Sequence, residues 1–97
     1  MTDWPALEER YFFHLLKRLP LTVVRGEGCH LYDEAGRQYL DFVGGIASVS
    51  LGHSHPVVVQ AIEEQARTLI QPSNLFYSVP QIEFAQALCE ASGFQRA

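Results

Sequence analysis

The four histidines and the single lysine are the residues of this 97-residue chain whose types could do chemistry. Imidazole nitrogens bind zinc or exchange protons near neutral pH, and a lysine amine can bond covalently to a carbonyl carbon. His53 and His55 stand one residue apart, but neither His14 nor His30 supplies a third ligand at a spacing typical of zinc sites. The pattern therefore predicts no metal site. It favours histidines that bond backbone groups around the start of a helix.

Lys17 is the only lysine, and it stands beside Arg18 late in an amphipathic pattern. A lysine that captures a carbonyl needs neighbours that keep its amine uncharged or hold the carbonyl close. The charged surroundings indicate instead a side chain on a solvated helix face. We therefore expect no catalytic lysine in this chain.

Composition excludes several classes of function. Hydrophobic residues make up 47% of the chain, which is typical of a folded segment, and eleven acids against seven bases are scattered without a run of either sign. This charge pattern predicts no nucleic-acid or membrane partner. Cys29 and Cys89 stand far apart, and the N-terminus has no signal-peptide pattern, so a cytoplasmic location is expected.

Residues 1–20 are expected to form an N-terminal helix. Apolar residues recur there at steps of three and four, Asp3 stands at a capping position and Pro5 in the first turn. The helix is expected to end near Pro20.

Residues 21–43 are rich in β-branched and aromatic residues and are expected to form short antiparallel strands. Between two of them, Asp33 can bond the backbone of a turn and Gly36 can adopt a left-handed conformation. A tight hairpin is the expected connection.

Residues 44–97 begin with a glycine-rich turn and continue into two helices. The first helix is expected from Pro56 to near Pro72, and the second from Ser78, at capping-box spacing from Gln81, to Gly93. The order of elements predicts an α+β fold with a minor antiparallel sheet, and residues 1–97 are expected to form part of one domain.

Several motifs in fixed order resemble one family. They are Arg25-Gly26-Glu27-Gly28, Leu31-Tyr32-Asp33 with Gly36, Tyr39-Leu40-Asp41-Phe42, Gly45-Ile46-Ala47, Leu51-Gly52-His53-Ser54-His55-Pro56 and Ser73-Asn74-Leu75-Phe76-Tyr77. Over roughly residues 8 to 97 the chain resembles the N-terminal part of class III (subgroup II) aminotransferases, in particular those of acetylornithine type.

The resemblance implies a small-domain segment of a fold-type I enzyme that uses pyridoxal 5'-phosphate and forms a homodimer. Such an enzyme would move an amino group from N-acetylornithine to 2-oxoglutarate in arginine biosynthesis. The catalytic lysine and the phosphate-binding turn of relatives lie beyond the segment that this chain matches. We therefore expect the 97-residue chain alone to lack the large domain, bind no cofactor and be inactive.

The resemblance also implies three substrate-pocket residues, Gly45, Ile46 and Tyr77. Ile46 falls where an ornithine-preferring relative carries tyrosine, so an apolar side chain there suits an acylated amine. Purely structural alternatives remain open: the glycines can serve only to redirect the chain, and Tyr77 can pack beneath its loop.

Two alternatives to the acetylornithine assignment follow from the same sequence. A related class III enzyme acting on ornithine, 4-aminobutyrate or succinylornithine would share these motifs. A chain of this length could also be an inactive remnant or a subunit that docks onto an aminotransferase.

Overall fold

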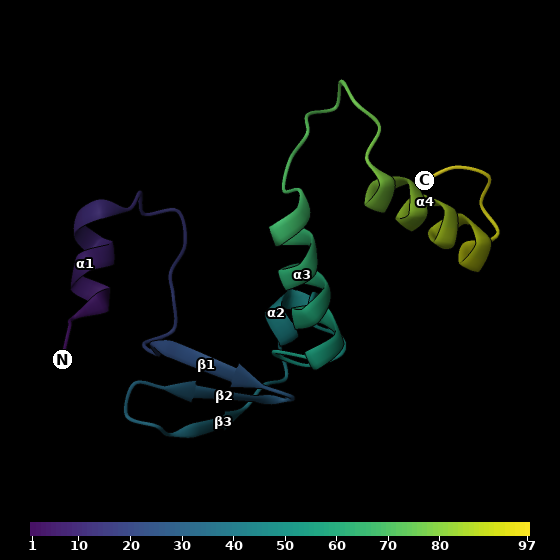
Figure 1. Cartoon of the computed structure of the whole chain (residues 1–97). Helices are drawn as coiled ribbons and strands as arrows, with labels where there is room; N and C mark the ends of the chain where they lie inside the picture. Colours follow the sequence, from purple (N-terminus) through teal and green to yellow (C-terminus); the bar gives the residue numbers. More distant parts are fainter. The chain divides into compact units, whose positions relative to one another are not determined.

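The computed structural model describes all residues 1–97 and contains four helices and one three-stranded antiparallel sheet. The chain divides into two compact units, Met1–Gln60 and Ala61–Ala97. This combination of helices with a small antiparallel sheet confirms the expected α+β class (Figure 1).

Helix α1 spans Trp4–Tyr11, and Asp3 caps it by accepting a hydrogen bond from the Ala6 amide at 3.1 Å. The prediction of a helix continuing to residue 20 is wrong, because Phe12 already has extended backbone angles. Leucines of the expected apolar stripe beyond this point are 76% to 84% exposed. Helices gain most of their stability from packing an apolar face, and this face has nothing in the chain to pack against.

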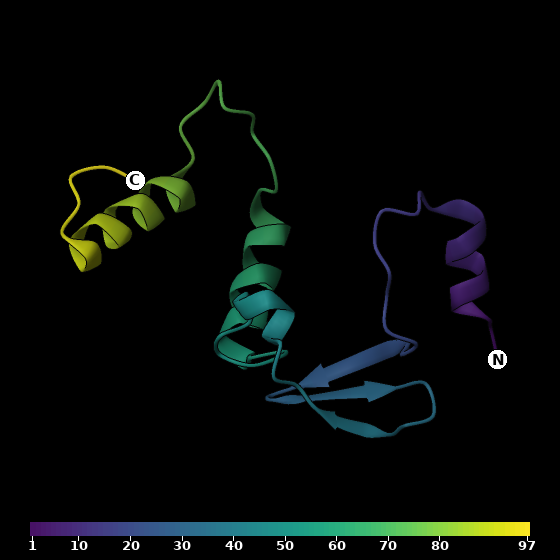
Figure 2. The same cartoon turned by 180° about the vertical axis from the view of Figure 1, so that it is seen from behind.

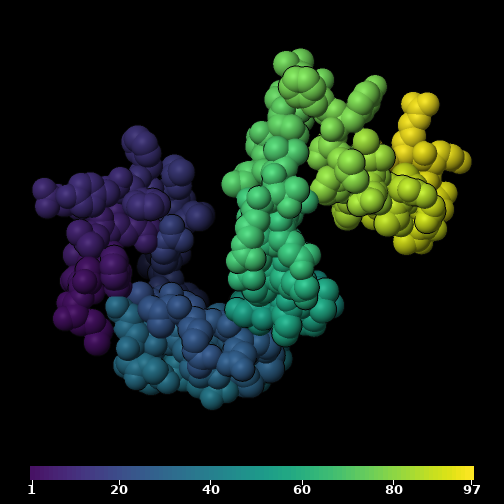
Figure 3. All heavy atoms as spheres, in the orientation of Figure 1, coloured from purple at the N-terminus to yellow at the C-terminus, as the bar shows by residue number.

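The sheet is a meander of β1 (Val23–Glu27), β2 (His30–Asp33) and β3 (Gln38–Leu40), in that spatial order. The strands lie side by side in both views (Figures 1 and 2) and form one continuous block of atoms, drawn in blue in Figure 3. This confirms the expected strands and hairpin.

The turn between β2 and β3 forms as its residue types predict. One oxygen of Asp33 accepts hydrogen bonds from the amides of Ala35 and Arg37, both at 2.9 Å. Gly36 has a φ of +78°, the left-handed conformation that glycine adopts without strain.

The short element α2 (Gly44–Ala47) is a left-handed turn. Its four residues have φ of 57°, 61°, 57° and 61°, and two of them, Ile46 and Ala47, are not glycine. The sequence predicted a glycine-rich turn here, and the structure shows that the unusual conformation extends beyond the glycines.

Helices α3 (Pro56–Thr68) and α4 (Val79–Ser92) confirm the two helices expected after this turn. Gly93 ends α4 with a φ of 76°, as predicted. The predicted capping box is wrong, because the Ser78 hydroxyl makes no capping hydrogen bond. In a capping box the Ser78 hydroxyl would accept from the amide of Gln81, the third helical residue, and that hydrogen bond is not formed.

No apolar side chain is buried anywhere in the chain, and Asp33 is the only buried residue. The side chains of α4 lie at the surface of the second unit on the face drawn in Figure 3. Residues 1–97 therefore have secondary structure and a polar framework without a hydrophobic core of their own.

Candidate functional site

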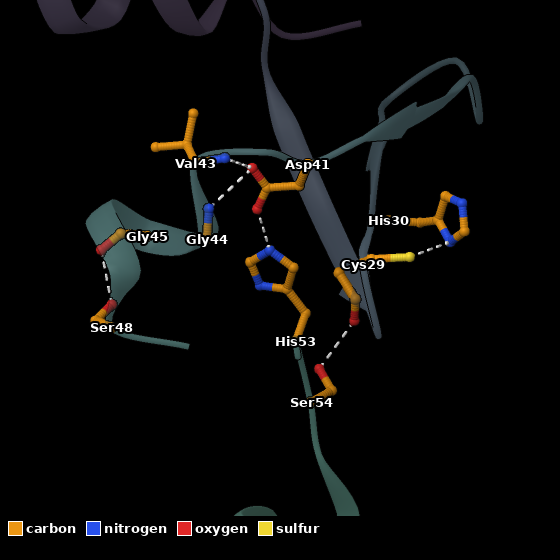
Figure 4. A network of polar contacts seen from close by, with 10 residues as sticks. Cys29, His30, Asp41, Val43, Gly44, Gly45, Ser48, His53 and Ser54 are labelled. Atoms are coloured by element: carbon orange, nitrogen blue, oxygen red, sulfur yellow. Dashed lines mark hydrogen bonds and ion pairs between the residues drawn. The ribbon is translucent and has the colours of Figure 1, made fainter. Parts of the chain in front are cut away.

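A hydrogen bond between the side chains of Asp41 and His53 organises the region between the sheet and α3. Asp41 follows β3, and its Oδ2 lies 2.6 Å from His53 Nε2. Both side chains are well shielded, with 6% of Asp41 and 19% of His53 exposed. Figure 4 shows the two side chains pointing toward one another.

The second oxygen of Asp41 accepts hydrogen bonds from the backbone at the start of the left-handed turn. Its Oδ1 accepts hydrogen bonds from the amides of Val43 at 2.8 Å and Gly44 at 3.1 Å (Figure 4). The hydrogen bond from His53, followed by those from the two amides, lowers the pKa of Asp41 and outweighs the opposing effect of burial. The carboxylate therefore stays ionised, and both its oxygens hold structure in place.

His53 is itself anchored on the β1–β2 connection. Its amide donates to the Gly28 carbonyl at 2.8 Å, and its carbonyl accepts from the Gly28 amide at 3.0 Å. A Cβ at Gly26 would lie 2.8 Å from the His53 side chain, so only glycine lets the imidazole approach this strand.

The two histidines thus differ from the expectation that both bond backbone groups around the helix start. His53 pairs through its backbone with Gly28 and through its ring with a carboxylate. Nδ1 of His55 is buried without a hydrogen-bond partner, whereas its backbone carbonyl accepts from the Val59 amide in the first turn of α3.

A pocket of about 390 Å³ lies against this pair. It is lined by Gly28, Cys29, Asp41, Gly44, Val49, Ser50, Leu51, Gly52 and His53. Because both oxygens of Asp41 already accept hydrogen bonds, this carboxylate is suited to fixing the shape of a pocket wall.

The predicted pocket residues belong to the two different units of the chain. Gly45 and Ile46 belong to the left-handed turn, where the Gly45 carbonyl accepts from Ser48 Oγ at 2.7 Å and Ile46 is 88% exposed. Tyr77 lies in the loop before α4 and is 97% exposed, so within residues 1–97 it does not pack beneath its loop.

A second polar cluster at the far end of the hairpin was only partly predicted. Asp33 Oδ2 accepts from Arg37 Nε at 2.7 Å and from the Tyr39 hydroxyl at 2.9 Å. Burial raises the pKa of Asp33, but the hydrogen bonds from Arg37 and Tyr39 and the charge of Arg37 overcome it and lower the pKa to about 2. The available signal was the two-residue spacing of Arg37 and Tyr39, which places both side chains on one face of an extended chain.

The chain does not provide a site for a carbonyl cofactor with a phosphate group. Lys17, its only lysine, is exposed and lines a pocket of about 770 Å³ between α1 and residues 14–22, beside Glu8 and Arg18. The amides of Gly44, Ala47 and Val49 at the left-handed turn already donate within the chain, so they offer no phosphate cradle. Nor does any group of three or more histidine, cysteine or acidic side chains lie close enough to hold a metal ion.

Comparison with known proteins identifies the family. The family model for class-III aminotransferases matches residues 14–96. Acetylornithine aminotransferase of Methanocaldococcus jannaschii is 47% identical over 98% of this chain and 24% of its own length. The corresponding enzyme of Archaeoglobus fulgidus is 43% identical over 97% of this chain and 25% of its own length.

Solved structures agree with this assignment. Acetylornithine aminotransferase from Elizabethkingia anophelis matches with a TM-score of 0.89 at 36% identity, over 96% of this chain and 24% of that one. Ornithine δ-aminotransferase from Plasmodium falciparum matches with a TM-score of 0.91 at 31% identity, over 97% of this chain and 24% of that one. The chain spans about a quarter of the length of these relatives. It belongs to the class-III aminotransferase family, and its α+β fold is that of the N-terminal segment of these enzymes.

Proposed function

We propose that this chain is the N-terminal segment of an aminotransferase that moves an amino group from N-acetylornithine to 2-oxoglutarate, as a step of arginine biosynthesis. The support is that relatives aligned over nearly the whole chain, at 47% and 43% identity, are named acetylornithine aminotransferases.

The observation that carries the proposal is the absence of any buried apolar side chain in a chain that is 47% hydrophobic. Soluble proteins rarely leave so much apolar surface uncovered. The surface is explained if these helices and strands normally pack against the remaining three quarters of an aminotransferase. Residues 1–97 would then supply a wall of the substrate pocket, and the rest of the enzyme would supply the catalytic lysine.

Gly45, Ile46 and Tyr77 are proposed to line that pocket. Ile46 is exposed on a turn whose backbone is fixed by several hydrogen bonds, and its side chain is apolar. An apolar side chain favours the uncharged acetylated end of a donor over a free ammonium group, which loses hydration on contact with it. Tyr77 offers an exposed ring with a polar hydroxyl, a combination suited to the edge of a binding site.

Pyridoxal 5'-phosphate is proposed as the cofactor of the complete enzyme, where it would supply the electron-withdrawing group for transamination. Family membership supports this, and a structure of the related ornithine aminotransferase from Toxoplasma gondii has that cofactor at partial occupancy in its active site. A homodimer is proposed from the resemblance to the same family.

A cytoplasmic location is also proposed, supported by two cysteines that form no disulfide. Separately, none of the helices has the length and apolar character needed to cross a membrane.

Donor kinetics of the complete protein test the substrate assignment. With 2-oxoglutarate as acceptor, kcat/KM for N-acetylornithine is expected to exceed that for ornithine by about ten-fold or more. Ile46→Tyr is expected to move the ratio toward ornithine, whereas Ile46→Val, which keeps an apolar β-branched side chain, is the matched control. A wild-type preference for ornithine would overturn the assignment.

Ornithine is the second candidate donor. The specific observation in its favour is the match to Plasmodium falciparum ornithine δ-aminotransferase, whose TM-score of 0.91 is at least as high as that of the acetylornithine enzyme from Elizabethkingia anophelis. The same kinetic comparison separates the two candidates.

A further inference from the structure

The left-handed turn at Gly44–Ala47 is a strained conformation that must be held in place. A left-handed helical conformation is unfavourable for every residue with a Cβ, and a β-branched residue such as Ile46 is a rare occupant. Here both Ile46 and Ala47 have φ near 60°. Strain of this kind persists only where the surrounding structure over-determines the backbone, and it concentrates at functional sites.

Hydrogen bonds hold the turn from both sides. At its start, Oδ1 of Asp41 accepts from the amides of Val43 and Gly44. Within it, the Ala47 amide donates to the Val43 carbonyl at 3.0 Å and the Val49 amide donates to the Gly44 carbonyl at 3.1 Å. The carboxylate of Asp41 is the only side chain that forms hydrogen bonds with the backbone amides of Val43 and Gly44. It therefore orients the chain where it leaves β3.

His53 connects this carboxylate to the sheet. Its ring bonds Asp41 Oδ2, and its backbone forms a reciprocal pair of hydrogen bonds with Gly28 between β1 and β2. The Asp41 amide also donates to the Cys29 carbonyl at 2.8 Å. Both ends of the 41–53 loop are therefore fixed to the same β1–β2 connection, and the turn that carries Ile46 projects from between them (Figure 4).

We infer that Asp41 and His53 are a positioning pair that sets donor selectivity: together they hold the left-handed turn, and the turn places Ile46 against the side chain of the amino donor. Both residues act through the turn and not by contact with the reacting atoms. The inference rests on the proposed function in its assignment of Ile46 to the donor pocket, whereas the holding of the turn is independent of that assignment.

Selectivity kinetics of the complete enzyme test the link to function. Asp41→Ala and His53→Ala are each expected to lower the ratio of kcat/KM for N-acetylornithine to that for ornithine by about ten-fold, mainly by raising KM for N-acetylornithine, because misplacing a contact group by about 1 Å costs one to two orders of magnitude. Asp41→Asn keeps an oxygen for the two amides and is expected to restore most of the ratio.

Asp33→Asn is the matched control. It removes another shielded carboxylate, whose side-chain partners Arg37 and Tyr39 belong to the β2–β3 hairpin and not to the left-handed turn. It is expected to lower stability and leave the ratio unchanged. Equal loss of selectivity in Asp33→Asn and Asp41→Ala, or an unchanged ratio in Asp41→Ala, would overturn the inference.

Amide hydrogen exchange tests the holding of the turn without any assay of activity. In Asp41→Ala and His53→Ala, the amides of Gly44, Ala47 and Val49 are expected to exchange about ten-fold faster or more, while those of Ala35 and Arg37 keep their wild-type rates. Asp33→Ala, which removes the oxygen that accepts from the Ala35 and Arg37 amides, should give the reverse pattern. Unchanged exchange at the turn would refute the positioning role even if the enzyme proves active on the proposed substrate. A wild-type enzyme without transaminase activity would instead refute the proposed function, and the exchange result would still decide whether the pair holds the turn.

Discussion

Asp33 is the one buried residue of this chain, and it accepts four hydrogen bonds from the turn and strand that follow it. Because its pKa is lowered to about 2 from 3.8, the unfolded chain takes up a proton at higher pH than the folded chain. The stabilisation is therefore fully present above the unfolded-state pKa and is lost as pH falls through the folded-state value.

We predict that Asp33 contributes to the free energy of unfolding, that this contribution is lost in acid, and that Asp33→Asn removes it. In the complete protein, the free energy of unfolding by urea should fall between pH 3.8 and about 2 more steeply in wild type than in Asp33→Asn, and the variant should be the less stable protein at neutral pH. Glu83→Gln is the control, since Glu83 is an exposed carboxylate of α4 with no hydrogen bond or ion pair. Parallel acid profiles for wild type and Asp33→Asn would contradict the assignment.

Gly52 gives a second prediction at the scale of single residues. It has a φ of +94°, and a Cβ there would lie 3.1 Å from the Gly28 backbone, whereas Gly36 has a φ of +78° and open space around it. Gly36→Ala should cost about 1 kcal/mol for the dihedral alone, and Gly52→Ala about 2 kcal/mol or more. Chemical denaturation of the two variants measures the difference, and equal costs would mean that the contact with Gly28 does not matter.

The roles of these residues could be predicted from the sequence only in part. The role of Asp33 in the turn followed from local spacing, because an aspartate three residues before a glycine bonds its own turn. The pairing of Asp41 with His53 could not be predicted in the same way. It depends on where the chain returns after the left-handed turn, and isoleucine and alanine inside that turn oppose their own backbone preferences.

Among the elements, those with strong local signals were predicted and those that need an external partner were not. The hairpin has its own turn chemistry, and α4 has a glycine at its end, so both appear where expected. The helix expected to continue to residue 20 has an apolar stripe but nothing in the chain to cover it, and it ends at Tyr11. The spacing of apolar residues predicts which face of a helix would be buried. It does not predict whether the chain contains a partner that covers this face.

The two helix caps provide a prediction at the scale of elements. The Asp3 carboxylate accepts from the Ala6 amide, whereas the Ser78 hydroxyl bonds no amide, although both residues occupy the N-cap position. Asp3→Ala should destabilise the first turn of α1 by about 1 kcal/mol, equivalent to about five-fold faster exchange of the Ala6 amide. Ser78→Ala should leave exchange in the first turn of α4 unchanged. A loss of protection in Ser78→Ala would show that its hydroxyl caps the helix after all.

For the whole chain, the exposed apolar surface predicts the behaviour of residues 1–97 in isolation. Side chains such as Phe13, Leu15, Phe42 and Ile70 are 84% to 90% exposed, and no apolar side chain is buried. Expressed alone, the chain should self-associate, as measured by sedimentation velocity over a range of concentrations. A monodisperse monomer at high concentration would contradict this expectation and would favour a self-sufficient module.

Intact mass of the natural protein, measured together with its visible absorption after addition of pyridoxal 5'-phosphate, tests the central claim most directly. We predict a polypeptide about four times as long as these 97 residues, since the chain covers 24% of the relative's length, and we predict that it shows the absorption of bound cofactor. A natural protein with a mass of 10.9 kDa and no such absorption would contradict the claim. The chain would then be a remnant or a docking subunit.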